Sequence, residues 1–266
     1  MFCIGDDICR RGVAHGLLPT SARATCKAMA ATPAWPPKSA PRLFVSDELG
    51  TGRIVCIEGN QANYLARVMR VGKGDAVILC DDVTGEWIAR VTEAGKRRVE
   101  LKVEDHLRPR EEVPDFWLCP ALLKKDRFDV VLEKSTELGV AAIHPVITRR
   151  CVADKLNGER ASTIVTEAAE QCARTALPQV AEPVKLDALL RDWPEDRILF
   201  FADEEGGEPA ADAFCYADGP AALLTGPEGG FDDAERAAIR AHPAARPISL
   251  GPRILRGETA ALAGIA

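Results

Sequence analysis

From Pro114 onward, strand-type and helix-type segments alternate along the chain, and this alternation restricts the fold more than any other sequence feature. It is typical of α/β domains, in which crossover helices connect parallel strands. The sequence therefore predicts an α/β domain with a largely parallel sheet over residues 111–266. The expected strands are 116–119, 140–147, 198–202, 221–224 and 247–250, and the expected helices are 126–138, 160–176 and 186–190.

The last two of these strands run directly into glycine-rich turns. Residues 225–230 read TGPEGG, residues 250–255 read LGPRIL, and a helix start follows each turn. Asp232 and Glu235 fit a capping box at the first of these helices. Glycine lets a backbone approach a ligand closely and aim its N–H groups inward, so both turns are candidates for a ligand site. Two ordinary α/β turns with surface arginines are the alternative.

Other cofactor and catalytic motifs do not occur in the sequence. No GxGxxG pattern follows a strand, because Gly72 and Gly74 belong to a β-turn, and no GxxxxGK[ST] pattern is present. Dinucleotide and nucleoside-triphosphate sites are therefore disfavoured. No GxSxG pattern or Cys/His arrangement indicates acyl transfer.

The segment before Pro114 has a different pattern, with short strands separated by glycine-rich turns. The turn at 71–75, VGKGD, is one example, and a helix over 60–69 interrupts the strands. Asn60 is the expected cap of that helix, and Tyr64, Leu65, Val68 and Met69 form its expected apolar stripe. The sequence predicts a small β-barrel domain over residues 41–110, with 108–114 as the linker. The expected strands are 42–45, 53–57, 76–79, 86–91 and 98–103.

Residues 1–40 show neither helical nor alternating periodicity and end in a proline-rich stretch, so we expect a disordered N-terminal extension. It contains no continuous apolar run of a secretory signal, and Met29 is an alternative start.

The cysteines and histidines show no metal-site spacing. The nine cysteines are scattered without a CxxC pair, and the four histidines lie far apart. We expect reduced, mostly buried thiols in a cytoplasmic protein, with no bound metal. No apolar run approaches the length of a membrane span, so no membrane insertion is expected.

The formal net charge of −6 argues by itself against a nucleic-acid-binding protein, but the acidic surplus is local. Residues 41–110 carry twelve basic and eleven acidic side chains, whereas residues 111–266 carry seventeen and twenty-seven. A basic face on the first domain, or a solvated salt-neutral surface, fits these counts.

Four separated motifs in the second half resemble one enzyme family. They are GPEGGF at 226–231, LGPRILRGETA at 250–260, KSTELGV at 134–140 and EAAEQCAR at 167–174. Together they resemble the RsmE-type 16S ribosomal RNA uracil-N(3) methyltransferases of the SPOUT superfamily. RLFV at 42–45 and YLARVMRVGKGD at 64–75 are similar to that family's PUA-like RNA-binding domain.

The resemblance implies a SPOUT-type knotted parallel-sheet methyltransferase domain preceded by a PUA-like β-barrel. It also implies a homodimer that binds S-adenosylmethionine and acts on 16S ribosomal RNA of the small ribosomal subunit. The two glycine turns would hold the cofactor. The implied cofactor-binding residues are Leu224, Thr225, Gly226, Pro227, Glu228, Gly229, Gly230, Leu250, Gly251, Arg253, Ile254 and Leu255.

Methyl transfer to the imide nitrogen of uracil requires loss of a proton, so the enzyme must supply a base or stabilise the anion. Arg256 is the candidate that stabilises the anionic ring, and Glu258 or Glu228 is the candidate proton acceptor. An ion pair between Arg256 and Glu258 would be structural instead. Lys124, Lys125 and Arg127 are candidate phosphate contacts. The expected RNA-contacting residues are Arg42, Arg67, Arg70, Lys73, Gln171 and Arg174.

The chain departs from the family pattern at two places. Gly257 stands where the family usually has Thr, and the final helix, expected over 258–266, is shorter than in similar proteins. With the shorter final helix, an RNA-binding or ribosome-assembly protein with impaired catalysis remains an alternative. A second alternative is a SPOUT methyltransferase that acts on transfer RNA.

Overall fold

The computed structural model describes residues 40–95, 97–215 and 217–266. The expectation of disorder for residues 1–40 lies outside these residues, apart from Ala40. The described residues fall within one contiguous unit of the fold.

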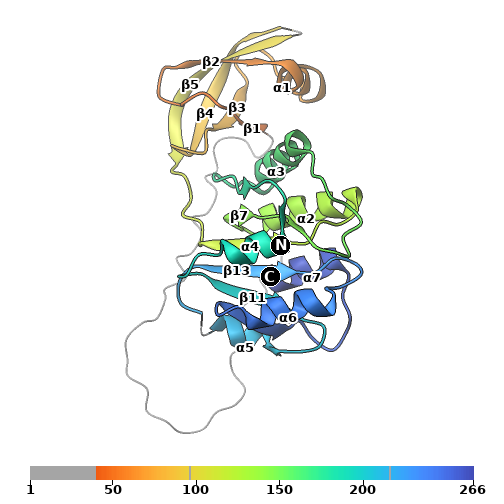
Figure 1. Ribbon diagram of the computed structural model, residues 1–266. Coiled ribbons are helices and arrows are strands. Elements are labelled where there is room, and N and C mark those ends of the chain that lie inside the picture. The colour runs from red at the N-terminus through yellow and green to blue at the C-terminus, as the bar shows by residue number, and fades with distance from the viewer. Residues whose placement is uncertain (1–39, 96, 216) are drawn as a thin grey trace, which may run out of the picture. The chain divides into compact units, whose positions relative to one another are not determined.

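The N-terminal domain contains a five-stranded sheet in the order β1-β3-β4-β5-β2 (Figure 1). β1 pairs with β3 in parallel, and the other neighbours pair antiparallel. Alternate residues of the strands point to one face and form a core that includes Leu43, Val77 and Leu101. All five expected strands are therefore present. Their bounds are β1 Arg42–Phe44, β2 Ile54–Glu58, β3 Ala76–Cys80, β4 Glu86–Ala94 and β5 Arg98–Arg108.

The helical segment of this domain differs from the prediction. It consists of α1, Gly59–Asn63, followed by a π-helical turn, η2, over Tyr64–Val68. Within this wider turn Val68 is 67% exposed and does not join Leu65 in the core, whereas Met69 packs against that core. The expected cap at Asn60 is also wrong, because the helix begins after Glu58 and has no side-chain cap.

The C-terminal domain contains a seven-stranded, fully parallel sheet in the order β12-β14-β11-β13-β6-β7-β9. Two further short strands, β8 and β10, pair separately. The predicted parallel α/β sheet is thus confirmed. The bounds are β6 Phe116–Pro120, β7 Ala142–Ile143, β8 Val146–Ile147, β9 Gln179–Val180, β10 Val184–Lys185, β11 Ile198–Ala202, β12 Glu208–Pro209, β13 Ala221–Thr225 and β14 Ala245–Ser249.

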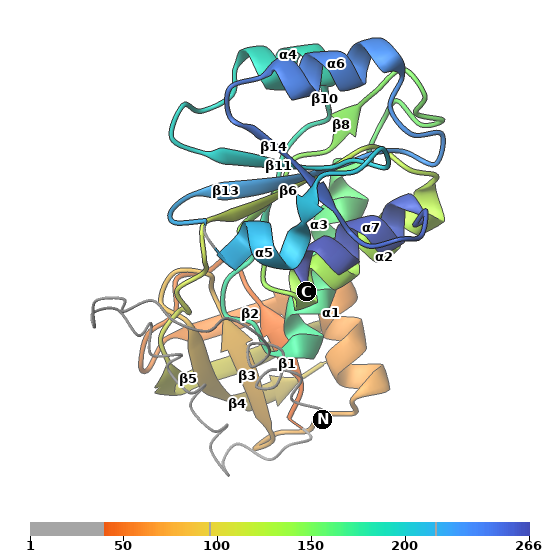
Figure 2. The ribbon, with the colours of Figure 1, turned by 90° about the horizontal axis from the view of Figure 1, so that it is seen from below.

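Helices cover both faces of this sheet. Figure 2 shows α4 and α6 on one face and α2, α3, α5 and α7 on the other. The predicted capping box is confirmed, because the Asp232 side chain accepts from Glu235 N and the Glu235 side chain accepts from Asp232 N. The bounds are α2 Lys125–Glu137, α3 Gly158–Cys172, α4 Leu186–Arg191, α5 Ala210–Cys215, α6 Asp233–Ala241 and α7 Gly257–Ile265.

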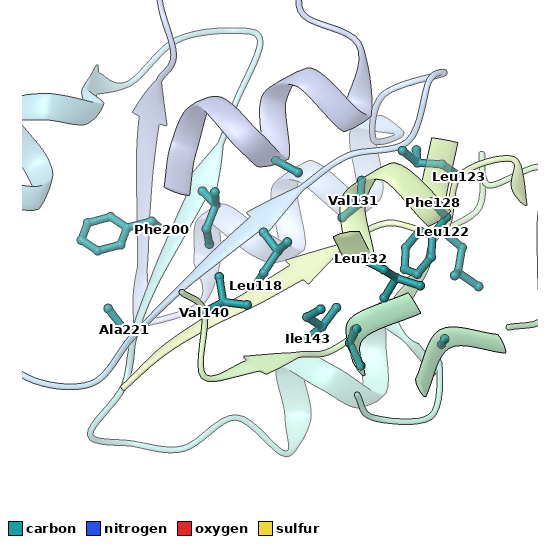
Figure 3. Close-up of a cluster of buried hydrophobic side chains, with 14 of the residues drawn as sticks. Leu118, Leu122, Leu123, Phe128, Val131, Leu132, Val140, Ile143, Phe200 and Ala221 are labelled. Carbon is teal, nitrogen blue, oxygen red and sulfur yellow. The ribbon is translucent and has the colours of Figure 1, made fainter. Parts of the chain in front are cut away.

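The central strands are apolar on both faces, as expected for strands buried between two helical layers. Leu118, Phe200 and Leu223 point to the α2 face, and their neighbours Cys119, Phe201 and Leu224 point to the opposite core. Figure 3 shows Leu122, Phe128, Val131 and Leu132 gathered against Leu118 on the first of these faces.

Three sequence expectations need correction. The expected strand over 140–147 is interrupted at His144 and Pro145, where the chain leaves β7 in the main sheet for β8 in the small one, and Pro145 has no N–H for a ladder. Helix α3 ends at Cys172, because Ala173 adopts a left-handed conformation with φ 62°. The thiols are not mostly buried, since Cys56, Cys172 and Cys215 are exposed among the six cysteines described.

No helix among the described residues is long and apolar enough to cross a membrane.

Candidate active site

Three loops meet at one edge of the parallel sheet. They follow β11, β13 and β14, which are neighbours in the order β14-β11-β13. The carboxyl ends of parallel strands lie at the same edge, which is where ligands bind in open α/β sheets. A cavity of about 260 Å³ lies there, and residues of all three loops line it. The two predicted glycine turns therefore contribute to one site, together with a third loop that the prediction missed.

Glycines allow the walls of this cavity to lie close together. A Cβ atom at Gly226 would lie 3.0 Å from the Phe231 ring, and one at Gly257 would lie 3.1 Å from the Gly226 carbonyl oxygen and 2.8 Å from Leu123 Cδ2. Gly230 has a φ of +67°, and its Cβ would lie 2.9 Å from Glu204 Oε1. Side chains at these positions would push the loops apart or close the cavity.

A buried arginine holds the acidic third loop. Arg236 on α6 is 8% exposed and pairs with Glu204 at 2.6 Å, Glu205 at 2.5 Å and Asp203 at 3.2 Å. Arg240 makes a second ion pair with Asp203 at 2.5 Å. Burial alone would lower the pKa of Arg236, but the hydrogen bond to Glu204 and the charges of Glu205 and Asp203 outweigh it and raise that pKa. The arginine therefore stays charged and fixes the loop.

A second, more open hollow of about 460 Å³ adjoins the cavity, and Ile254 and Leu255 line both. Its remaining lining residues are Lys124, Arg127, Val152, Glu228 and Arg256. Arg256 is exposed and stands at the N-cap of α7. Glu258 pairs with Arg127 at 3.3 Å, and not with Arg256. Three cations and one carboxylate thus surround a space beside the cavity.

Most of the predicted cofactor-binding residues come together in the cavity. Leu224 and Thr225 instead lie buried beneath it, where the Thr225 carbonyl accepts from Ala121 N at 2.9 Å. Glu228 lines the second hollow, and the Gly229 carbonyl accepts from Arg150 Nη1 at 2.9 Å. The residues that line the cavity as predicted are Gly226, Pro227, Gly230, Leu250, Gly251, Arg253, Ile254 and Leu255.

The prediction missed Asp203, Glu204, Phe231 and Arg236, which also line the cavity. A signal for the third loop was present, because the apolar strand at 198–202 runs into DEEGG at 203–207, as the other two strands run into glycine.

The expected RNA-contacting residues fall into two groups. Arg67, Arg70 and Lys73 are exposed on the N-terminal domain. The Arg42 side chain is only 15% exposed and donates to Glu86. Arg174 is 6% exposed and donates to the carbonyls of Thr136 and Val140. These two arginines satisfy buried acceptors, so we no longer assign them to RNA.

Gln171 is exposed, but it lies in a groove between α2 and α3 whose charged residues are mostly acidic. Carboxylates repel phosphate, so this groove is a poor surface for RNA. The charged residues of the groove are Asp129, Glu133, Glu137, Arg160 and Glu167.

Comparisons with known proteins agree with this geometry. A family model described as an RNA methyltransferase domain matches residues 110–266, more than half of the chain, and an RNA methyltransferase PUA domain matches residues 57–104. The chain belongs to the RsmE-type family of ribosomal RNA methyltransferases. A ribosomal RNA small subunit methyltransferase E from Synechocystis is 32% identical over 85% of this chain and 76% of its own length. The Rickettsia conorii protein of the same name is 27% identical over 85% of this chain and 93% of its own length.

Two solved structures are similar in fold to this chain. A putative methyltransferase from Legionella pneumophila, in complex with S-adenosylmethionine, is 30% identical with a TM-score of 0.77. A ribosomal RNA small subunit methyltransferase E from Neisseria gonorrhoeae, bound to the same cofactor, is 29% identical with a TM-score of 0.77. Each match covers 85% of this chain and 95% of the other. The expected SPOUT-type domain with a preceding PUA-like domain is thereby confirmed.

Proposed function

We propose that this RsmE-type protein transfers a methyl group from S-adenosylmethionine to ring nitrogen 3 of a uridine in 16S ribosomal RNA of the small subunit. The observation that carries the proposal is the cavity formed by three adjacent strand ends, with a hollow of three cations directly beside it. The names of the curated relatives and the cofactor in two related structures support the same activity.

The chemistry of the cavity fits this cofactor. Its walls combine apolar side chains, such as Phe231 and Leu255, with glycine backbone and the exposed carboxylate of Glu204. Apolar walls suit an adenine ring, and carboxylates suit a molecule that carries a positive sulfonium. A phosphate-bearing cofactor would instead meet repulsion from Glu204. When bound, S-adenosylmethionine supplies an electrophilic methyl group.

The residues of the second hollow provide the chemistry on the uracil side. The ring must lose its N3 proton, and cations stabilise the negative charge that develops on its carbonyl oxygens. We assign this role to Arg256, with Lys124 and Arg127 adding positive potential. Glu228 in the same hollow is our candidate proton acceptor. Glu258 orients Arg127 through their ion pair, so we give it a positioning role.

We assign RNA phosphate binding to Arg67, Arg70 and Lys73 of the PUA-like domain, because these cations are exposed. A trefoil knot is part of the proposal. It is supported by the path of the chain, which leaves β14 and returns past β11 so that α7 packs against β13, β6 and α2.

We also propose a homodimer, because Ile254 is 88% and Val152 69% exposed at the rim of the hollow, and large apolar side chains gathered at one place favour an interface. A cytoplasmic location follows from ribosomal RNA as substrate.

Of the alternatives, a catalytically impaired RNA-binding protein has no use for a cofactor cavity, and the curated relatives are named for small-subunit RNA, not transfer RNA. The test is to incubate the purified protein with S-adenosylmethionine and unmethylated small ribosomal subunits, and to map methylated uridines by mass spectrometry. We expect one N3-methyluridine in 16S ribosomal RNA. Absence of methylation, or methylation of transfer RNA only, would refute the proposal.

A further inference from the structure

The acidic loop after β11 lies between the two glycine turns of the cavity. β11 stands between β14 and β13 in the sheet, so its loop, Asp203–Gly206, separates the turn at 250–256 from the turn at 226–231. Asp203 and Glu204 line the cavity from this central position. A ligand held by both glycine turns must pass in front of them.

The loop is rigid at the point that faces the cavity. Asp203 N donates to Ile248 O at 3.0 Å, and the Asp203 side chain accepts from Glu205 N at 3.0 Å. Arg236 then anchors Glu204 through Oε1 at 2.6 Å. Among the described residues, Glu204 Oε2 has no hydrogen-bond partner, and the Glu204 side chain is 46% exposed. One carboxylate oxygen is therefore held in place and the other is available to a ligand.

Gly230 keeps this carboxylate accessible. Its φ of +67° brings the backbone close to Glu204, and a Cβ there would lie 2.9 Å from Oε1. Any side chain at position 230 would displace the carboxylate from the cavity wall.

We propose that Glu204 accepts hydrogen bonds from the ribose hydroxyls of the cofactor, and that Arg236 positions it. This inference rests on the proposed function. In S-adenosylmethionine, ribose joins adenine to the methionine portion. Glu204 is on the loop between the two glycine turns, and its carboxylate lies beside Gly230, so it is placed to meet this joining sugar. A carboxylate held by one oxygen can accept from a vicinal diol, as acidic residues do in other nucleotide sites. Asp203 does not compete for this role, because its side chain is fully buried and both oxygens are paired with arginines.

The test measures binding by isothermal titration, with S-adenosylhomocysteine and its 2′,3′-dideoxy analogue as probes. For the wild type we expect tighter binding of the hydroxylated ligand. Glu204→Gln, which preserves shape and one acceptor oxygen, should weaken binding of S-adenosylhomocysteine by about tenfold or more, since a hydrogen bond to a charged acceptor is lost. It should change the affinity for the dideoxy analogue by less than about twofold.

Glu205→Gln is the matched control. Glu205 also pairs with Arg236, at 2.5 Å, but it lies outside the cavity and is 58% exposed. We expect Glu205→Gln to leave the affinities for S-adenosylhomocysteine and for the dideoxy analogue unchanged. This control separates a direct contact between Glu204 and the ligand from an indirect effect through Arg236.

Three results for the Glu204→Gln variant would overturn the inference. Glu204→Gln could leave binding of S-adenosylhomocysteine unchanged, or weaken both probes equally. The variant could also lose affinity for the dideoxy analogue but keep wild-type affinity for 5′-methylthioadenosine, which has the ribose hydroxyls but no amino-acid portion. That result would assign Glu204 to the methionine ammonium. If the wild type binds none of these ligands, the proposed cofactor fails and the inference fails with it. Normal wild-type binding with a silent Glu204→Gln variant refutes the inference alone.

Discussion

Two sets of arginines, one in each domain, have opposite roles. In the PUA-like domain, Arg67 and Arg70 are exposed, and in the methyltransferase domain Arg174, Arg197 and Arg236 are each less than 9% exposed. Arg197, for example, pairs with Asp115 at 2.8 Å and stacks 3.6 Å from the Trp117 ring centroid. Charge counts along the chain treat these side chains alike. Of these two sets, only the exposed arginines can supply a binding surface, while the buried ones hold loops and carbonyls in place.

Loss of the buried Arg236 should have the strongest effect on stability. Arg236→Ala removes the partner of three clustered carboxylates, one of them fully buried, and should lower the free energy of unfolding by about 3 kcal/mol. Arg70→Ala, at an exposed position, should change it by less than about 0.5 kcal/mol. Urea denaturation of both variants measures the contrast. Equal stabilities would show that the buried arginine is not structural.

The next effect concerns Gly257, the first residue of α7. A Cβ there would lie 2.8 Å from Leu123 Cδ2, so Gly257→Thr should destabilise the protein by about 1 to 3 kcal/mol through overpacking. Adding Leu123→Ala should recover part of this loss, because it removes the clashing methyl groups. A double-mutant cycle by urea denaturation gives the coupling energy. Purely additive effects would show that Leu123 does not fill the space of the missing side chain.

A smaller effect is expected on RNA affinity. Replacing Arg67, Arg70 and Lys73 together by Gln should weaken RNA binding by about tenfold at moderate salt and lower the slope of log affinity against log salt by about 2. Thermal stability and S-adenosylhomocysteine affinity should stay at wild-type values. Binding measured at several salt concentrations tests this, and an unchanged slope would mean that RNA contacts another surface.

The smallest effect is pH dependence at Glu170. Burial raises the pKa of this carboxyl to about 7. The hydrogen bond that Phe44 N donates to Oε1, at 2.8 Å, acts in the opposite direction and lowers this pKa. A carboxyl with a raised folded-state pKa stabilises the fold below about pH 4.5, and this contribution is lost as pH rises through about 7. Because Glu170 is half-buried, solvent screens the effect, and we expect less than about 1 kcal/mol. Glu170→Gln should flatten that part of the stability profile between pH 5 and 8, and an unchanged profile would contradict the assignment.

The sequence predicted most of the fold because its signals were local. Apolar strands that end in glycine located two of the three cavity loops, and the residues of the capping box identified the start of α6. The π-helical turn at Tyr64–Val68 was not predictable from an apolar stripe, since a π turn changes the helical period. The roles of Arg42 and Arg174 depend on acceptors 44 and 38 residues away, which periodicity does not reveal.

In this division of work, the PUA-like domain binds RNA while the methyltransferase domain performs the reaction. Single-turnover methylation of small-subunit RNA, measured over a range of RNA concentrations, tests this division most directly. We expect the triple variant of Arg67, Arg70 and Lys73 to need more RNA but to reach the wild-type rate at saturation, because its chemical step is intact. Arg256→Ala should bind RNA normally and remain slow at saturation, by about 100-fold. A triple variant that stays slow at saturating RNA, or an Arg256→Ala variant with a wild-type rate, would contradict the account.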